Sequence, residues 1–276
     1  MYKERRVCKI ADRKEVEMME EALVVKDLCK TYITNKRQNN VLKNVKFTIK
    51  EGEMVAIMGP SGSGKSTLLY CVSGMDRPTA GEVFLEGKKI TELSETELAK
   101  ARLNEMGFIF QQMHMLKNLS VMDNILLPAY QSGKNNRSRA EINEYCRELM
   151  RKLEISDIAE NDITEVSGGQ LQRACICRSL INQPEILFAD EPTGALNRSA
   201  SEEVMEMLNR LNVEGMTMML VTHDMKVAAN CSRILYIVDG NIKGELQLER
   251  KENYSSEGGR KERERKVNQW LNDMGW

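Results

Sequence analysis

The sequence predicts an α/β fold in which a mixed core sheet carries an antiparallel β lobe and a helical lobe. Three observations predict it. Apolar, β-type runs separated by turn-rich segments extend from Ala22 to Ile57. The stretch from Val121 to Leu180 reads as mostly helical. An apolar strand, a glycine-rich turn and the start of a helix follow one another from Met54 to Leu69.

Composition indicates an ordinary globular protein. The chain has 276 residues, of which 41% are hydrophobic and 29% charged, and this length is ample for a core. Its net charge of −1 gives no argument for wholesale nucleic-acid binding, so we expect no nucleic-acid partner. Its seven scattered cysteines suit a reducing cytosol. No apolar run approaches the roughly 18 residues of a membrane span, so another chain would have to cross any membrane that it serves.

The glycine-rich turn has the spacing of a phosphate-binding loop. Gly59, Gly64, Lys65 and Ser66 satisfy the pattern G-x-x-x-x-G-K-[ST]. Glycines allow backbone N–H groups to approach phosphate oxygens, and the helix N-terminus and Lys65 add positive charge. Ser66 offers a hydroxyl to Mg²⁺, which prefers oxygen ligands. The chain is therefore expected to bind a nucleoside triphosphate.

The first half of the chain divides into short elements. Residues 1–20 form a charged, polar leader, and the main domain is expected over 21–248. TNKRQNN and EGE separate the first strands, Gly74 ends the helix of the phosphate loop, and GEVFLEGKKI reads as a second strand pair. The helical lobe is expected over about 91–180. It begins with the capped helix TELSETELAKARLNEM, continues with the short strand GFIFQQ, and is interrupted by QSGKNNRS.

The second half returns to strands. EILFADE and TMMLVTHD are apolar strands, and the amphipathic helix ASEEVMEMLNRLNVEG lies between them. RILYIVDGNIKGEL reads as a hairpin with D-G at its turn. Residues 249–276 are expected to form a charged linker, up to about residue 266, and a short amphipathic helix. The apolar residues of that helix recur at i, i+3, i+4 and i+7 and are Val267, Trp270, Leu271 and Met274. By default we expect this apolar face to dock on its own subunit; the alternative is that it docks on a partner.

Polar groups that end two of these strands are candidates for chemistry. Asp190 and Glu191 close an apolar strand, where two adjacent carboxylates are costly for a core. Asp190 can hold Mg²⁺ through water, and Glu191 can polarise an attacking water. His223 ends the next strand, at the edge where ligands of open α/β sheets collect. A lone histidine at a strand end is more often structural, and the contact with the γ-phosphate that we expect rests mostly on the family resemblance described below.

A second anion site is expected at Val166 to Gln170, VSGGQ, which precedes a helix N-terminus. One γ-phosphate is not expected to need two complete anion-binding sites from the same subunit. We therefore expect each chain to lend this turn to the ATP of the other in a head-to-tail, two-fold dimer.

From about Leu23 to Leu246 the sequence resembles the ATP-binding subunits of ABC transporters. GPSGSGKST is similar to the Walker A loop, FIFQQ to the Q-loop, and VSGGQLQR to the family signature with Val in place of Leu. ADEPTGALN resembles Walker B followed by the D-loop, and His223 resembles the switch histidine. The resemblance implies a P-loop NTPase fold of the ABC type and an ATPase that uses ATP and Mg²⁺.

The resemblance assigns roles by motif. Glu191 and His223 would be catalytic, Ser66, Gln111 and Asp190 would hold Mg²⁺, and Tyr32 would stack on adenine. The remaining residues implied in ATP binding are Gly59, Ser61, Gly62, Ser63, Gly64, Lys65 and Thr67, together with Gln111 and Ser66, and, from the opposite subunit, Ser167, Gly168, Gly169 and Gln170. The D-loop residues would be Ala195, Leu196 and Asn197.

One residue departs from the family pattern. The D-loop usually ends in Asp, whereas this one ends in Asn197, which keeps the hydrogen-bonding shape and loses the charge. We expect an active ATPase, and the change either alters coupling between the two sites or is neutral.

Within the family the chain looks most like macrolide exporters, lipoprotein-releasing ATPases and bacitracin-type peptide-resistance transporters. This implies a homodimer at the cytoplasmic face of the membrane, bound through the Q-loop and helical lobe to separate permeases. Their substrate would be an antimicrobial peptide, a drug or a lipid-linked molecule. The segment Met113 to Leu127 either makes that contact or belongs to the core. The alternatives are a sensing complex that signals through a partner kinase and a soluble ABC ATPase without a permease.

Overall fold

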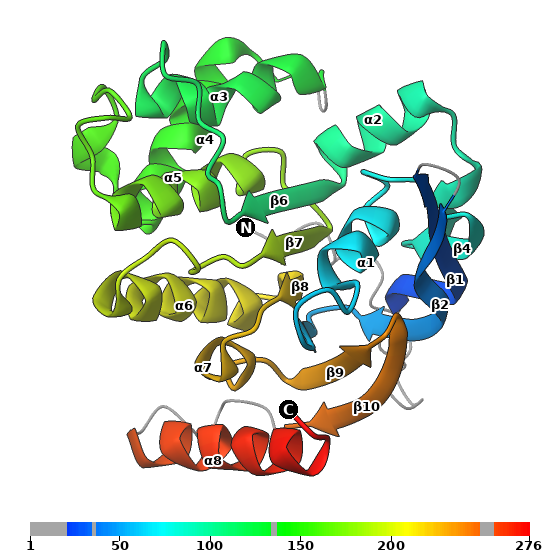
Figure 1. Ribbon diagram of the computed structural model, residues 1–276. Coiled ribbons are helices and arrows are strands. Elements are labelled where there is room, and N and C mark those ends of the chain that lie inside the picture. The colour runs from blue at the N-terminus through cyan, green and yellow to red at the C-terminus, as the bar shows by residue number, and fades with distance from the viewer. Residues whose placement is uncertain (1–20, 35–36, 134–136, 249–256) are drawn as a thin grey trace, which may run out of the picture.

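The computed structural model describes residues 21–34, 37–133, 137–248 and 257–276 (Figure 1). The leader expected over residues 1–20 lies outside the described residues. Two sheets lie side by side, and the helices α3, α4 and α5 form a lobe at one end of the larger sheet (Figure 1).

The larger sheet has six strands in the order β10-β9-β3-β8-β7-β6. From β9 to β6 all neighbours run parallel, and β10 pairs antiparallel with β9. The central strands are apolar except for Thr217 and Asp190 at their ends, as expected where both faces of the sheet are covered. The strand bounds are β3 (Met54–Met58), β6 (Met106–Phe110), β7 (Ile186–Asp190), β8 (Thr217–Val221), β9 (Arg233–Val238) and β10 (Asn241–Gln247).

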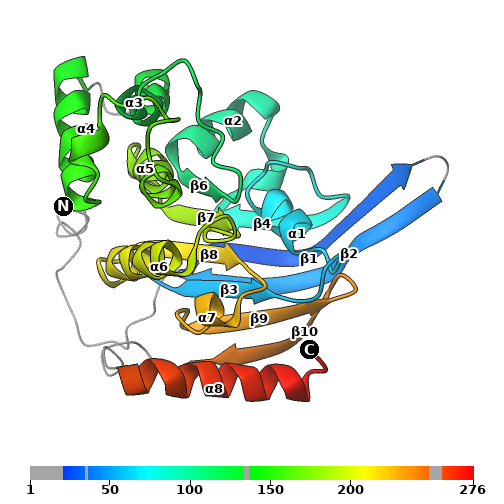
Figure 2. The ribbon, with the colours of Figure 1, turned by 60° about the vertical axis from the view of Figure 1, so that its left-hand side comes forward.

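The smaller sheet is antiparallel, in the order β2-β1-β4-β5. Its strands are β1 (Glu21–Thr34), β2 (Arg37–Lys50), β4 (Ala80–Leu85) and β5 (Lys88–Lys89). The expectation that TNKRQNN separates two strands as a turn is wrong for most of it, because β1 and β2 pair as far as Thr34 and Arg37. Cross-strand pairing of Thr31 with Asn40, including a 2.8 Å side-chain hydrogen bond, overrides the turn-like composition. Figure 2 shows the resulting hairpin extending beyond the rest of the sheet.

Helix α1 (Lys65–Val72) lies between the two sheets. One face of the large sheet packs on it through alternate residues such as Val55, Ile57 and Phe188. The opposite face, through residues such as Ala56 and Leu220, packs on the helical lobe and on the helices that follow. The helices of this opposite face are α3 (Val121–Ser132), α4 (Arg139–Lys152), α5 (Gly168–Leu180), α6 (Arg198–Val213), α7 (Met225–Ala228) and α8 (Glu257–Asp273), with the 3-10 turn η4 (Ser156–Ile158). The helix α2 (Glu95–Asn104) and the 3-10 turn η2 (Ile90–Glu92) pack on the α1 side instead, through Ile90, Leu98 and Ala101.

Serine caps define where α2, α3 and α4 begin, as the sequence predicts for α2. Ser94 and Glu97 form a reciprocal capping box at α2, and Ser138 and Glu141 form another at α4. Ser120 caps α3 by accepting from the Asp123 N–H.

The C-terminal helix α8 begins at Glu257, earlier than expected, so a linker up to residue 266 is wrong from that point on. The charged stretch contains a buried residue: Arg263 is 4% exposed, and its guanidinium donates to the carbonyls of Ala229, at 2.7 Å, and Cys231. Val267 and Leu271 are fully buried. The apolar face of α8 therefore docks on its own subunit.

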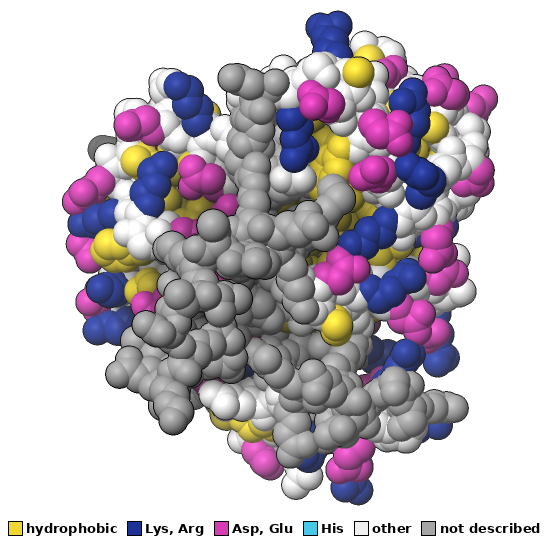
Figure 3. All heavy atoms as spheres, turned by 180° about the vertical axis from the view of Figure 1, so that it is seen from behind, with side chains coloured by type: hydrophobic (Ala, Val, Ile, Leu, Met, Phe, Trp, Pro, Cys, Tyr) yellow, Lys and Arg dark blue, Asp and Glu magenta, His cyan; other side chains and the backbone are white. Residues whose placement is uncertain are grey.

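No helix among the described segments combines the length and the apolar character needed to cross a membrane. On the face of the molecule seen in Figure 3, basic and acidic side chains of the described residues are interspersed rather than gathered in patches of one sign.

Trp270 is the residue to remove in order to test the docking of α8. Its ring meets Tyr236 of β9 edge-on, with 6.0 Å between centroids. Trp270→Ala should lower the free energy of unfolding by about 2 kcal/mol, less than for a fully buried tryptophan because the ring is half-buried. It should also make α8 susceptible to limited proteolysis.

The control is Asn268→Ala, which changes an exposed residue on the same helix and should stay within about 0.5 kcal/mol of the parent. Equal urea midpoints and equal proteolysis for both variants would show that α8 does not depend on this contact.

Candidate active site

The register of four parallel strands places the predicted site residues side by side. Ile57 pairs with Val221, Val221 with Asp190, and Asp190 with Phe110. The residues that follow these positions are the phosphate loop, His223, Glu191 and Gln111, and all leave the sheet at its carboxyl edge.

The phosphate loop between β3 and α1 is a cradle of backbone. Gly59 has φ 156°, and a Cβ there would lie 2.0 Å from the Ile237 carbonyl oxygen. Gly64 has φ 102°, and a Cβ there would lie 2.9 Å from the Val41 carbonyl oxygen. Neither position tolerates a side chain. Helix α1 starts directly after Gly64 without a side-chain cap, so its first N–H groups remain available to an anion.

The side chains of the loop fit a polyphosphate. Lys65 Nζ donates to the carbonyls of Gly59, at 2.7 Å, and Pro60, at 2.9 Å, so the ammonium lies across the loop. Burial lowers the pKa of Lys65, and the charges of Glu191 and Asp190 oppose that shift. Ser63 is buried, and its hydroxyl finds no hydrogen-bond partner among the residues that the structure describes. Ser61 and Gly62 are exposed, and Thr67 is half-buried in the first turn of α1.

Asp190 forms a cluster of oxygens with α1. Ser66 Oγ donates to Asp190 Oδ1 at 3.2 Å, and the Tyr70 hydroxyl donates to Asp190 Oδ2 at 3.2 Å. Burial raises the pKa of Asp190, and these two hydrogen bonds oppose the shift. The donors are oxygens, which fits Mg²⁺. Our sequence reasoning missed Tyr70, although it lies four residues after Ser66 and therefore on the same face of the helix.

Glu191 and His223 are in direct contact. His223 Nδ1 lies 2.7 Å from Glu191 Oε1, and the His223 backbone N–H donates to the same oxygen at 3.1 Å. The Thr222 hydroxyl, also missed by sequence reasoning, donates to Glu191 Oε2 at 3.3 Å. Glu191 has φ 50° and precedes Pro192, a strained backbone of the kind that gathers at functional sites. The carboxylate is mostly covered, with 16% of the side chain exposed, whereas the histidine side chain is 68% exposed.

Gln111 comes to this edge but lies over the turn after Glu191. A Cβ on Gly194 would be 3.0 Å from Gln111 Nε2 and 3.3 Å from Glu191 Cβ. The hydrogen bonds of Ser66 and Asp190 in the described chain do not include Gln111. The structure therefore places Ser66 and Asp190 in direct contact. Gln111, the third predicted Mg²⁺ ligand, lies near them without a hydrogen bond to either in the part of the chain that the structure describes.

Tyr32 lies on the long β1–β2 hairpin, and 39% of it is exposed. Its hydroxyl donates to Asp76 Oδ2 at 2.6 Å. Burial and this hydrogen bond raise the pKa of Tyr32 to about 12, and an opposing contribution comes from Thr67 at the start of α1. The aromatic ring is therefore a neutral phenol that lies beside the phosphate-loop helix.

The signature turn is not brought to the phosphate loop of its own chain. Ser167 caps α5 and forms a reciprocal capping box with Gln170. Gly168 and Gly169 face Leu196 and Ala200, which follow Glu191 along the chain. Ser167 and Gly168 are exposed.

The D-loop leads from the turn after Glu191 into α6, and its Leu196 lies against the signature turn. Ala195 is exposed and Leu196 is half-buried. Asn197 is the N-cap of α6, and its Oδ1 accepts from the Ala200 N–H at 3.0 Å. An aspartate could make the same bond, so the family's usual residue and this one share a local structural task.

Helix α5 contacts both the segment after Glu191 and the segment after the Q-loop, through hydrogen bonds that sequence reasoning missed. Gln172, 1% exposed, donates to the Pro192 carbonyl at 2.7 Å, directly after Glu191. Arg178 donates to the carbonyls of Met113, at 2.7 Å, and His114, at 2.8 Å, directly after the Q-loop.

The segment Met113 to Leu127 divides between the two alternatives that the sequence leaves open. Its second half, including Val121 and Ile125, is buried core. Its first half is half-buried or exposed, with Leu116 47% exposed, and remains available to a partner.

Comparison with known proteins identifies what this site resembles. A family model described as ABC transporter matches residues 42–194. An ABC transporter ATP-binding protein of Methanocaldococcus jannaschii, MJ0796, is 41% identical over 226 residues, which cover 81% of this chain and 96% of that protein. Its solved dimeric post-hydrolysis state, bound to ADP and Pi, has a TM-score of 0.76 at 39% identity and covers 83% of this chain and 99% of that chain.

A second group of relatives is longer. The macrolide export ATP-binding/permease protein MacB of Escherichia coli is 42% identical over 224 residues, covering 81% of this chain. The chain spans only 34% of that protein's length. The comparisons confirm the predicted fold class and the predicted resemblance.

Asn197→Asp tests the role of the D-loop residue. The substitution keeps the cap and adds a negative charge at the N-terminus of α6, whose first turn has no acidic residue. Chemical unfolding at neutral pH should show a gain of about 0.3–1 kcal/mol. The new carboxylate has a lowered folded-state pKa, so the gain should be present above its unfolded pKa and be lost as the pH falls below about 3.

The matched variant Asn197→Ala removes the cap and should lose about 1 kcal/mol. If Asn197→Ala were as stable as the parent chain, Asn197 would not be the cap on which α6 depends.

Proposed function

This chain belongs to the ABC transporter family, and on that premise we propose that it is the motor subunit of a transporter, in which two copies close head to tail around two Mg-ATP. The chain is an ATP-binding ATPase cassette. One observation carries the proposal: the phosphate loop, Asp190, Glu191 and His223 share one sheet edge, while the signature turn around Ser167 faces outward from the same chain.

The residues divide the work by position. Lys65 and the N–H groups of the loop stabilise the charge of the β- and γ-phosphates. Ser66 and Asp190, with Gln111 nearby, hold Mg²⁺, which when bound would neutralise phosphate charge. Glu191, anchored by Thr222 and His223, accepts a proton from the attacking water, and His223 is open to the γ-phosphate.

The missing half of each pocket comes from the second copy. Ser167 and Gly168 are exposed, and the N-terminus of α5 adds a positive dipole to Ser167, Gly168, Gly169 and Gln170 as a cradle for the opposite γ-phosphate. The dimeric ADP- and Pi-bound structure of the MJ0796 cassette supports this arrangement. The D-loop residues Ala195, Leu196 and Asn197 would lie at the interface.

The membrane partner is a permease. MacB relatives, named ATP-binding/permease proteins, support such a partner over a permease-free ATPase. The exposed first half of Met113 to Leu127, next to Gln111, and the helical lobe would receive it, at the cytoplasmic face of the membrane. The cargo would be an antimicrobial peptide, a drug or a lipid-linked molecule.

Glu191→Gln tests the chemistry. It should retain ATP affinity, because the phosphate loop is unchanged, and lose turnover by roughly 10²-fold or more, because the general base is removed. Steady-state phosphate release and calorimetric ATP binding measure the two quantities.

Glu185→Gln is the matched control, because Glu185 is exposed and flanks the opposite end of β7. It should leave turnover unchanged. Parent-level turnover in Glu191→Gln would remove Glu191 from the role of general base.

A further inference from the structure

The inner face of the Tyr32 ring is covered by a buried cation. Lys30 lies two residues earlier on β1, and its ammonium is 4.7 Å from the centre of the ring. Lys30 is 8% exposed, whereas Tyr32 is 39% exposed. The ammonium therefore backs the ring from inside the protein, and the other face is open for stacking.

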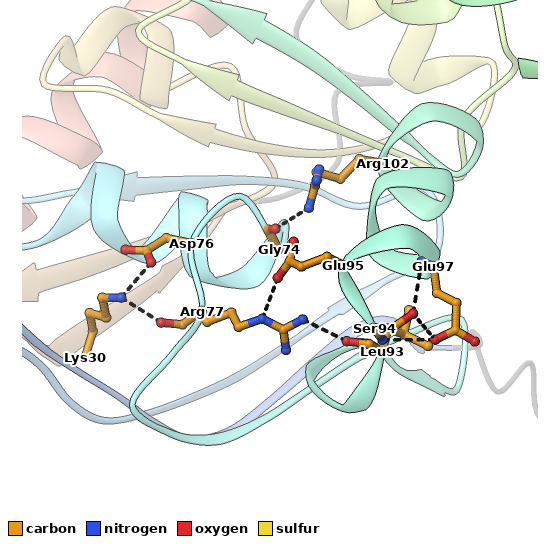
Figure 4. Close-up of polar contacts among 9 residues, drawn as sticks. All are labelled: Lys30, Gly74, Asp76, Arg77, Leu93, Ser94, Glu95, Glu97 and Arg102. Carbon is orange, nitrogen blue, oxygen red and sulfur yellow. Dashed lines mark hydrogen bonds and ion pairs between the residues drawn. The ribbon is translucent and has the colours of Figure 1, made fainter. Parts of the chain in front are cut away.

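Asp76 holds both members of this pair. It accepts from the Tyr32 hydroxyl at 2.6 Å through one oxygen and from Lys30 Nζ at 2.6 Å through the other. Burial favours a higher pKa for Asp76, but the hydrogen bonds from Lys30 and Tyr32 outweigh burial and lower it. Lys30 also donates to the Arg77 carbonyl at 2.7 Å, as Figure 4 shows.

The carboxylate is itself fixed to the phosphate-loop helix. The N–H groups of Met75 and Asp76 both donate to the Tyr70 carbonyl, at 2.9 and 3.0 Å, in the last turn of α1. The other side of the segment is fastened to α2: Arg77 pairs with Glu95 at 2.6 Å, and Arg102 donates to the Gly74 carbonyl at 2.6 Å (Figure 4). One rigid path thus runs from the phosphate loop along α1 to Asp76 and from there to the Tyr32 ring.

We propose that Asp76 and Lys30 are positioning residues for the nucleotide base: Asp76 sets the distance and tilt of the Tyr32 ring relative to the phosphate loop, and Lys30 supports the ring's inner face. This inference rests on the proposed function, because it concerns the same ATP site. Asp76 and Lys30 contribute to the affinity for the nucleotide base, whereas the phosphate loop binds the phosphates. A purely structural network would instead weaken phosphate and nucleotide binding equally, through a loosened α1.

Two probes separate these cases in calorimetric titrations with Mg²⁺ present. Mg-ADP contains the base and Mg-pyrophosphate lacks it, and neither is turned over. Asp76→Asn, Lys30→Met and Tyr32→Phe should each raise the Kd for ADP by about three- to tenfold and leave the Kd for pyrophosphate within about twofold of the parent. Lys30→Arg keeps the cation and should restore most of the ADP affinity.

Glu95→Gln is the control, because it breaks the Arg77 branch of the network without touching Tyr32 or Lys30. It should bind both probes as the parent does. In steady-state assays Lys30→Met should raise the KM for ATP and leave kcat within about twofold.

Equal weakening of ADP and pyrophosphate, or no weakening of either, would overturn the positioning role alone. Failure of the parent chain to bind either probe, or full binding of both by Lys65→Ala, would overturn the proposed site and this inference with it.

Discussion

The parallel register of β3, β8 and β7 is the constraint on which the rest of the structure depends. Ile57, Val221 and Asp190 lie level across the sheet, so the groups that follow them meet at one edge. Both faces of these strands are buried, and a slip of one residue would exchange the side chains that face α1 with those that face the helical lobe. Packing of the core therefore fixes the geometry of the chemistry.

Local motifs could be predicted from the sequence because each is determined within a few residues. The phosphate loop is one, since Gly59 and Gly64 occupy positions that no side chain fits. The residues that contact these motifs could not be predicted from the sequence, because their contacts depend on packing between distant elements. The bonds from Asp76 to β1 are one case, and the buried Arg263 within a highly charged segment is another. Tyr70 is an intermediate case. Its contact with Asp190 joins distant elements, but its spacing of four residues from Ser66 would have predicted that it lies on the same face of the helix.

In the proposed dimer each chain holds only half of an ATP pocket, and the contacts of α5 give the physical reason. The Ser167 side chain caps α5, and the N-terminus of that helix is exposed at the surface. Gln172 and Arg178 connect α5 to the residues next to Glu191 and the Q-loop. In the proposed dimer, a movement of the signature turn on closure would therefore be transmitted both to Glu191 and to the surface proposed for the permease.

The mass of the Glu191→Gln variant in solution with saturating Mg-ATP tests the central claim most directly. Analytical ultracentrifugation should show a dimer with ATP and a monomer without it, because each protomer completes the pocket of its twin. A strictly monomeric variant at saturating Mg-ATP, both alone and with its permease, would contradict the account.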